Sequence, residues 1–143
     1  MSKGMTAIAL AGALCAGVLH SSARAYQTKS VLDGVYTEEQ GKRGAGVYAQ
    51  ECASCHGSTL EGGEMAPPLA GAAFMSNWQG LTAGDLFERI RISMPDGNPG
   101  KLSRQQNADV VAYILSVSKA PAGKEELPKE LELLKQIKIE PPK

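Results

Sequence analysis

Apolar residues at helical spacing and helix-capping side chains mark three helices along this chain. They predict helices over residues 37–51, 82–93 and 103–118. The second helix ends before Pro95, because the residue preceding a proline is pushed out of the helical region. Each start carries a capping box, a pair of side chains that satisfies free backbone N–H groups: Thr37 with Gln40, Thr82 with Asp85, and Ser103 with Gln106.

The segments between these helices are long for a small domain. Residues 57–80 contain Gly-Gly and Pro-Pro pairs and are predicted to be a loop of about 24 residues, which a bare protein core seldom accommodates. No alternation typical of strands occurs, so we predict an all-α fold with long loops that wrap a large cofactor. Three glycines inside the first helix each cost about 1 kcal/mol relative to alanine, and we expect them to permit a close helix crossing: Gly41, Gly44 and Gly46.

Two segments flank the helical part. Residues 26–36 are polar and are predicted to be an extended lead-in. Residues 119–143 form a tail rich in Pro, Lys and Glu that we expect to be partly helical, with Pro128 at a helix start. Its apolar stripe keeps helical spacing: Leu127, Leu131, Leu134 and Ile137.

The first 25 residues have the parts of a secretory signal peptide. Lys3 precedes the uncharged run 4–19, and Ala23-Arg24-Ala25 has the Ala-x-Ala form of a cleavage site. A transmembrane anchor is the weaker alternative, since the run falls short of the roughly 20 apolar residues that span a bilayer. We therefore expect residues 1–25 to be removed, Cys15 with them, and the mature protein to be periplasmic.

The charges are balanced, with 15 Lys and Arg against 15 Asp and Glu. Binding of nucleic acid needs a surplus of basic residues on one face, so this class of partner is not expected. Cleavage of the signal peptide would remove one Lys and one Arg, leaving 13 basic against 15 acidic residues, a net charge of −2. It would also leave two Cys and one His, all within residues 52–56.

Those three residues, Cys52, Cys55 and His56, form a C-x-x-C-H motif, the attachment signature of c-type haem. Two thiols three positions apart on one turn can bond to a single porphyrin, with the next residue held beneath the iron. Three alternatives use the same residues. One is a structural disulfide, one a redox dithiol that would need a βαβ neighbourhood, and one a zinc site that would lack a fourth Cys or His ligand.

The second axial ligand of such an iron has to be sought among the methionines, because no second His follows the signal peptide. Met65 lies only nine residues after His56, and Met75 lies in a segment where packing is the ordinary role of a methionine. Met94 follows a helix and precedes Pro95, which suits a side chain directed inward from a loop. From spacing alone, axial ligation and core packing stay open for Met94.

Over residues 37–118 the sequence resembles the class I c-type cytochromes. The lead-in and haem motif together resemble small periplasmic cytochromes that accompany quinoprotein dehydrogenases. Besides C-x-x-C-H, the resemblance rests on a Gly and an aromatic residue before the motif, Gly44 and Tyr48, which precede Cys52 at intervals of four residues. After the motif it rests on P-x-L-x-G, formed by Pro67, Leu69 and Gly71, and on the Met94-Pro95 step.

The resemblance implies a cytochrome c fold, with three main helices and long loops around one covalently bound haem c. The residues it assigns to the site are Cys52 and Cys55 for attachment, His56 and Met94 as iron ligands, the Pro67 carbonyl as acceptor of the His56 N–H, and Trp78 as donor to a haem propionate. For Trp78, core packing is the alternative.

The function implied is one-electron transport, not enzymatic catalysis. A periplasmic dehydrogenase would be the donor and an oxidase or another cytochrome the acceptor, with the membrane touched only by transient docking. One alternative is a permanently bound electron-transfer subunit of a dehydrogenase complex, for which the apolar stripe of the tail would be an interface. The other is a haem enzyme or gas sensor with an open iron.

Overall fold

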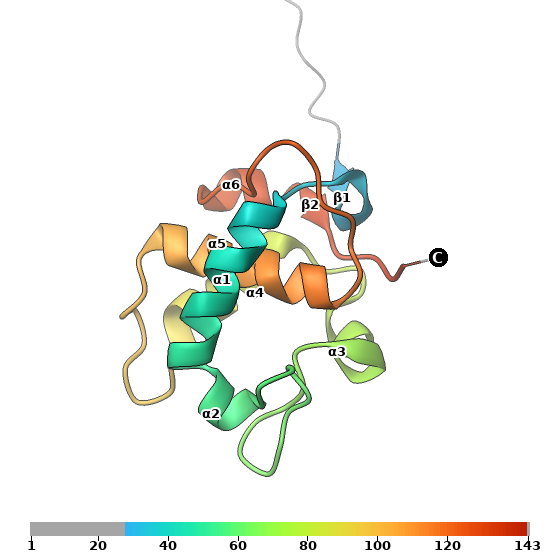
Figure 1. Ribbon diagram of the computed structural model, residues 1–143. Helices are drawn as coiled ribbons and strands as arrows, with labels where there is room; N and C mark the ends of the chain where they lie inside the picture. Colours follow the sequence, from blue (N-terminus) through green and yellow to red (C-terminus); the bar gives the residue numbers. More distant parts are fainter. Residues whose placement is uncertain (1–27, 143) are drawn as a thin grey trace, which may run out of the picture.

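The computed structural model describes residues 28–142, which form a bundle of helices joined by long loops (Figure 1). The predicted signal peptide lies outside this range. The all-α prediction is confirmed, apart from one pair of two-residue strands. In chain order the elements are β1 (Lys29–Ser30), a 3-10 turn (Val31–Asp33), α1 (Glu38–Glu51), α2 (Ala53–His56), α3 (Gly71–Trp78), α4 (Ala83–Ser93), α5 (Arg104–Val117), α6 (Leu131–Leu134) and β2 (Ile137–Lys138).

Two of the three predicted capping boxes close as expected. In α4 and α5 the cap side chain and the side chain three residues on each bind the other's backbone N–H. In α1 the Thr37 hydroxyl accepts from the Gln40 N–H at 3.1 Å, but the Gln40 side chain does not return to the cap. The Gln40 side chain is buried and binds the backbone of Leu127 instead. The capping box predicted for α1 was therefore wrong in one of its two contacts, the one from Gln40 back to the cap.

The predicted loop over residues 57–80 was wrong in part, because its last third contains α3. The residue before α3 is Ala70, whose side chain caps nothing, so no start signal is present in the sequence. Phe74 and Trp78, four residues apart, stack with ring centroids 6.1 Å apart. Phe74 is fully buried, so α3 is a helix held by tertiary packing rather than by its ends.

Helices α1 and α5 cross with their backbones in close contact. A Cβ atom added at Gly44 would lie 1.8 Å from the carbonyl oxygen of Asp109, so only glycine permits this approach. Tyr48 and Tyr113 meet one turn further along, with ring centroids 5.3 Å apart. The expectation that glycine is required holds for Gly44 alone. A Cβ atom at Gly41 would be in ordinary contact with Ser116 of α5, 3.8 Å away, and one at Gly46 would meet nothing within 4 Å.

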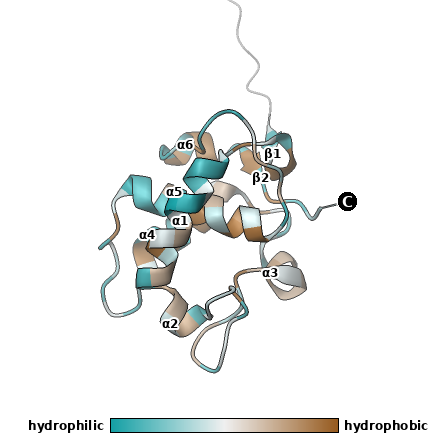
Figure 2. Ribbon diagram, in the orientation of Figure 1, coloured by the Kyte–Doolittle hydropathy of each residue, from teal (hydrophilic) through white to brown (hydrophobic). Residues whose placement is uncertain are grey.

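On each helix, the buried side chains lie on the side that packs against the rest of the protein. The outward first turns of α1 and α5 are hydrophilic (Figure 2). No helix in the described part of the chain is long and apolar enough to span a membrane. Within the described residues, the largest fully buried side chains are spread along the sequence and include Tyr48, Leu60, Phe74, Leu86, Phe87, Ile114, Leu115, Leu127, Leu134 and Ile139.

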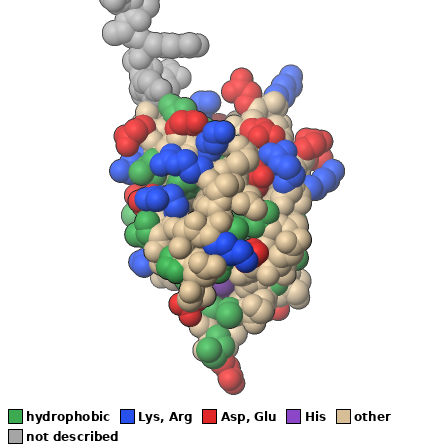
Figure 3. Space-filling view, turned by 90° about the vertical axis from the view of Figure 1, so that its left-hand side faces the viewer, with side chains coloured by type: hydrophobic (Ala, Val, Ile, Leu, Met, Phe, Trp, Pro, Cys, Tyr) green, Lys and Arg blue, Asp and Glu red, His purple; other side chains and the backbone are tan. Residues whose placement is uncertain are grey.

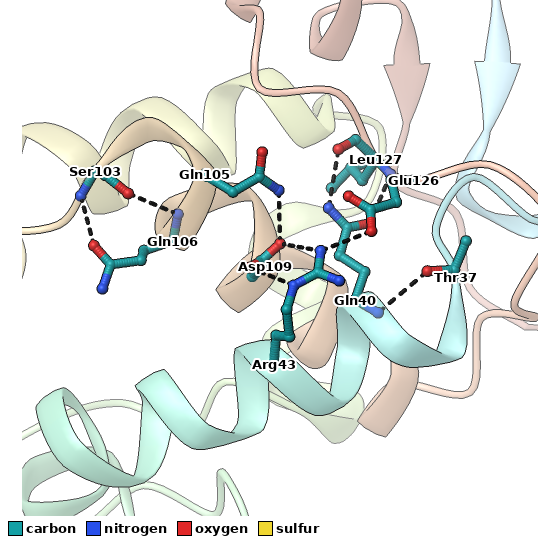
Figure 4. Close-up of polar contacts among 9 residues, drawn as sticks. All are labelled: Thr37, Gln40, Arg43, Ser103, Gln105, Gln106, Asp109, Glu126 and Leu127. Carbon is teal, nitrogen blue, oxygen red and sulfur yellow. Dashed lines mark hydrogen bonds and ion pairs between the residues drawn. The ribbon is translucent and has the colours of Figure 1, made fainter.

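Residues 119–139, which we call the C-terminal strap, wrap around the helices. The strap begins with a hydrogen bond from the Tyr36 hydroxyl to the Ala120 carbonyl at 2.7 Å. The Gln40 amide then binds both the N–H and the C=O of Leu127, at 2.6 and 3.0 Å (Figure 4). At its end, β2 pairs in parallel with β1, and Ile139 bonds to the segment between α3 and α4.

The apolar stripe of the tail therefore packs on its own chain. Leu127, Leu134 and Ile137 are buried, and only one turn of the tail, α6, is helical. Helix α6 begins at Leu131, three residues after Pro128. This arrangement leaves the stripe without the free surface that a subunit interface would need.

A group of polar side chains ties α1, α5 and the strap together (Figure 4). Arg43 donates two hydrogen bonds to the Asp109 carboxylate, both at 3.1 Å, and a third to Glu126 at 2.8 Å. Gln105 donates to Asp109 as well, at 2.9 Å. The Asp109 side chain is only 6% exposed, so its charge needs these partners.

The crossing at Gly44 gives a matched pair of substitutions. Gly44→Ala places a methyl group against the Asp109 carbonyl, and we expect it to lower the free energy of unfolding by about 2–4 kcal/mol. Gly46→Ala, on the same helix in open space, should raise it by up to about 1 kcal/mol. Chemical denaturation of the two variants measures both values, and equal effects would contradict the crossing.

Candidate haem site

The C-x-x-C-H motif is positioned by the end of α1. Cys52 is both the last cap of α1, with its N–H bonded to the Tyr48 carbonyl at 2.9 Å, and the first cap of α2. The N–H groups of Cys55 and His56 both bond to the Cys52 carbonyl, at 3.1 and 3.0 Å. All three motif residues thus lie on one tight turn, as attachment to one porphyrin requires.

His56 is oriented by a carbonyl group from the following loop. Its ring is buried, 8% exposed, and Nδ1 lies 2.8 Å from the carbonyl oxygen of Pro67. A carbonyl oxygen can only accept, so Nδ1 is the donor in this bond, and Nε2 is the ring nitrogen left to bind a metal. A histidine in this state is ready to bind a metal through Nε2, with the carbonyl fixing the ring.

The loop that supplies this carbonyl is held by backbone bonds rather than left free. The Gly62 N–H bonds to the His56 carbonyl at 2.8 Å, and the Leu69 N–H to the Leu60 carbonyl at 2.9 Å. Leu60 is fully buried and has a φ of 65°, a left-handed conformation that is uncommon for residues other than glycine. These contacts fix where Pro67 lies relative to His56.

Tyr48 anchors the same turn from the side of α1. Its hydroxyl donates to the carbonyl of Gly57 at 2.7 Å, directly after the motif. The ring is 1% exposed, and burial raises the pKa of the hydroxyl to about 12, with smaller contributions from Cys52, Tyr113 and Glu61. The hydroxyl therefore stays protonated and keeps donating. Sequence reasoning assigned Tyr48 only to the motif, and nothing in the sequence reveals this hydrogen bond.

Both cysteines are free thiols, Cys52 half-buried and Cys55 exposed. Burial, with smaller contributions from Glu51 and Cys55, raises the pKa of Cys52 to about 11. A redox dithiol of the thioredoxin kind depends on a lowered pKa, so this environment disfavours that alternative. Within residues 28–142 no group of three or more His, Cys, Asp and Glu side chains is arranged to hold a metal ion, so the zinc alternative has no support there.

The three candidate methionines differ in exposure. Met65 is 84% exposed in the loop after the motif, which removes it from any buried site. Met75 on α3 and Met94 at the end of α4 are half-buried against the core. Met94 caps α4 with an extended backbone, its N–H bonded to the Ile90 carbonyl at 2.8 Å.

The predicted site residues thus fall into two groups. The structure brings Cys52, Cys55, His56 and Pro67 together on one turn and its loop. Met94 and Trp78 lie on other elements, the ends of α4 and α3, and their roles stay predictions. Trp78 is half-buried and stacked on Phe74, which is the packing role foreseen as its alternative.

The profile of the family described as cytochrome c oxidase, cbb3-type, subunit III matches residues 39–114, more than half of the chain. The chain belongs to this family of c-type cytochromes. The cytochrome c subunit of the cytochrome bc1 complex of Corynebacterium diphtheriae is 31% identical over 85 residues, which covers 56% of this cytochrome and 28% of the relative. The chain thus spans little more than a quarter of that relative's length.

A solved structure gives a weaker likeness to this cytochrome. The crystal structure of the sulfane dehydrogenase SoxCD from Paracoccus pantotrophus contains a chain that is 23% identical, with a TM-score of 0.45. The alignment covers 60% of the cytochrome and 52% of that chain. At this level the likeness carries no argument about function.

The family implies covalently bound haem c, and the motif residues of this cytochrome fit it. Cys52 and Cys55 present two free thiols on one turn, and His56 presents Nε2 as a metal ligand. This donor set, a buried imidazole whose ring is oriented through Nδ1, is the proximal half of a haem site.

The hydrogen bond from Tyr48 to Gly57 can be tested by removing the hydroxyl. We expect Tyr48→Phe to lower the free energy of unfolding by about 1–2 kcal/mol, because the partly buried Gly57 carbonyl loses its donor. Tyr113→Phe is the control, since the Tyr113 hydroxyl has no partner among the described residues. Denaturant titration of the haem-loaded proteins compares them, and an equal loss in both would refute the anchoring role.

Proposed function

We propose that this cytochrome is a periplasmic one-electron carrier with one haem, acting between a dehydrogenase and a downstream acceptor. The observation that carries the proposal is the oriented His56, with Nδ1 on the Pro67 carbonyl and both cysteines on the same turn. The motif occurs once in the sequence, which supports a single haem. The signal-peptide pattern of residues 1–25 supports the periplasm.

Each residue then has a defined task. Haem c supplies a one-electron iron couple when bound. Cys52 and Cys55 hold the group covalently, and His56 binds the iron through Nε2 while Pro67 keeps the ring from turning. Met94 supplies a thioether, which favours the ferrous form and raises the reduction potential. With His56 and Met94 both holding the iron, no position would be left for a substrate, so we propose a carrier and not an enzyme.

The surface around the motif supports docking through uncharged contacts. We call α2, the loop after it and α3, residues 52–80, the charge-poor face: its only charged residues are Glu61 and Glu64. Charged side chains gather in the upper half of Figure 3, and few lie below. Cys55 and Met65 are exposed on this face. A partner with an apolar contact area and no acidic cluster fits it.

The weak negative charge of this face predicts a salt dependence. Oxidation of the reduced protein by cationic tris(phenanthroline)cobalt(III) should slow about two- to threefold from low to high ionic strength, and oxidation by hexacyanoferrate(III) should not slow. Glu64→Gln should weaken the salt dependence of oxidation by the cobalt complex, whereas substitution of the exposed Glu132 of α6, Glu132→Gln, should not. Stopped-flow measurement decides, and equal effects of the two variants would place docking elsewhere.

A permanently bound subunit is the second candidate. The relative from Corynebacterium diphtheriae is named as a subunit of a bc1 complex, which supports it. The tail does not, since its apolar stripe packs on its own chain. Size-exclusion chromatography of the native protein separates the candidates, because a permanent subunit elutes with a larger partner.

The axial assignment is tested with two methionine substitutions of equal size. Wild-type ferrous protein should bind carbon monoxide poorly, and intact mass should show one haem. Met94→Leu removes the thioether at nearly constant volume and should open the iron to carbon monoxide. Met75→Leu, also half-buried, should behave as wild type. Absorption spectra report both, and a Met94→Leu protein that stays closed would refute this ligand. Ready binding by wild type would favour the open-site sensor.

A further inference from the structure

The loop that follows Met94 has few contacts of its own. Residues 96–100 are all exposed, and Gly97 and Gly100 have φ values of 78° and 79°. Its internal bonds are two turns, Asn98 N–H to the Pro95 carbonyl at 2.9 Å and Lys101 N–H to the Asn98 carbonyl at 3.4 Å. Exposed backbone with little packing opens locally at low free-energy cost.

One side-chain contact joins this loop to the far side of the site. The Lys101 ammonium donates to both carboxylate oxygens of Glu51, at 2.8 and 2.7 Å. Among the described residues, these two bonds are the only side-chain hydrogen bonds from residues 95–101 to another part of the chain. Glu51 is the last residue of α1 and directly precedes Cys52, so the pair links the segment after Met94 to the helix that carries the attachment motif.

The position of Glu51 explains why it needs a cation. A helix C-terminus carries partial negative charge, and a carboxylate there is unfavourable. The last turn of α1 contains no basic residue. The Glu51 side chain is 20% exposed and Lys101 47%, so the charges are screened less than in a fully exposed pair. Lys101 supplies the missing positive charge from a loop 50 residues further along.

We propose that Glu51 and Lys101 are positioning residues that hold the loop after Met94 against the end of α1 and so keep Met94 on the iron. This proposal rests on the proposed function, in which Met94 is an axial ligand. Breaking the ion pair frees the loop, and Met94 leaves the iron more often. The pair thus controls how readily an added ligand replaces the thioether.

The same molecule contains a control pair. Arg91 and Glu88 bond at 2.9 and 2.7 Å, three residues apart on α4 and just before Met94. Their side chains are 38% and 31% exposed, comparable to the proposed pair. Both lie on one helix, so breaking this contact frees no loop. Substitution of Arg91 therefore changes the charge near Met94 and leaves the contact between the loop and α1 intact.

The first readout is the rate at which imidazole displaces Met94 from the ferric protein, followed by loss of the weak far-red absorption of iron–sulfur ligation. At low salt, Lys101→Met and Glu51→Gln should each raise this rate about two- to fivefold. The double variant should be no faster than either single one, because both remove one interaction. Lys101→Arg, which keeps the cation, should retain the wild-type rate. The differences should shrink in 1 M NaCl, where screening acts within about 3 Å.

The second readout is amide hydrogen exchange at Asn98 in the haem-loaded protein, which needs no ligand displacement. We expect faster exchange in Lys101→Met and unchanged exchange in Arg91→Met. The proposal would be overturned if Lys101→Met kept the wild-type rates of both imidazole binding and amide exchange. It would also be overturned if Arg91→Met accelerated them as much as Lys101→Met does. If the wild-type protein lacks the iron–sulfur absorption, Met94 does not bind the iron and that part of the proposed function is refuted. Exchange at Asn98 then still decides whether the ion pair holds the loop.

Discussion

The contact between the backbones of α1 and α5 at Gly44 determines how the rest of the molecule is arranged. A side chain at this position would overlap the Asp109 carbonyl, so the two helices cross closer than other residues allow. That approach sets Tyr48 against Tyr113 and, through the Tyr48 hydroxyl, fixes the Gly57 carbonyl just beyond the motif. The backbone just after the motif is therefore anchored by helix packing, while the His56 ring is oriented by the Pro67 carbonyl of the following loop.

The C-terminal strap solves a different problem, that of a small chain with few large side chains. Aromatic residues make up only 5% of the sequence, so helix faces alone provide limited apolar area. The strap adds buried Leu127, Leu134 and Ile139 to the core. The Gln40 amide binds both backbone groups of Leu127, which lets an irregular segment be buried without unpaired polar atoms at that point.

The sequence predicted what local rules govern. The reciprocal caps of α4 and α5 and the one-turn geometry of the motif depend on neighbouring residues alone, and all were foreseen. Helix α3 was missed, because its first residue follows an uncapped Ala70 and its stability comes from Phe74 in the core. Gln40 was misread for the same reason: a buried partner 87 residues away outcompetes the cap.

The ion pairs divide the molecule into a firmly held and a weakly held part. Asp109, with a side chain 6% exposed, is bound by Arg43 and Gln105 at the crossing, and loss of one partner there leaves a buried charge unpaired. The pair at Glu51 and Lys101 lies nearer to solvent, where each contact contributes about 1 kcal/mol or less. Local opening is therefore easier at the loop after Met94 than at the turn that carries His56. In the proposed function, the segment that opens more easily is thus the one that borders Met94, and not the turn of Cys52, Cys55 and His56.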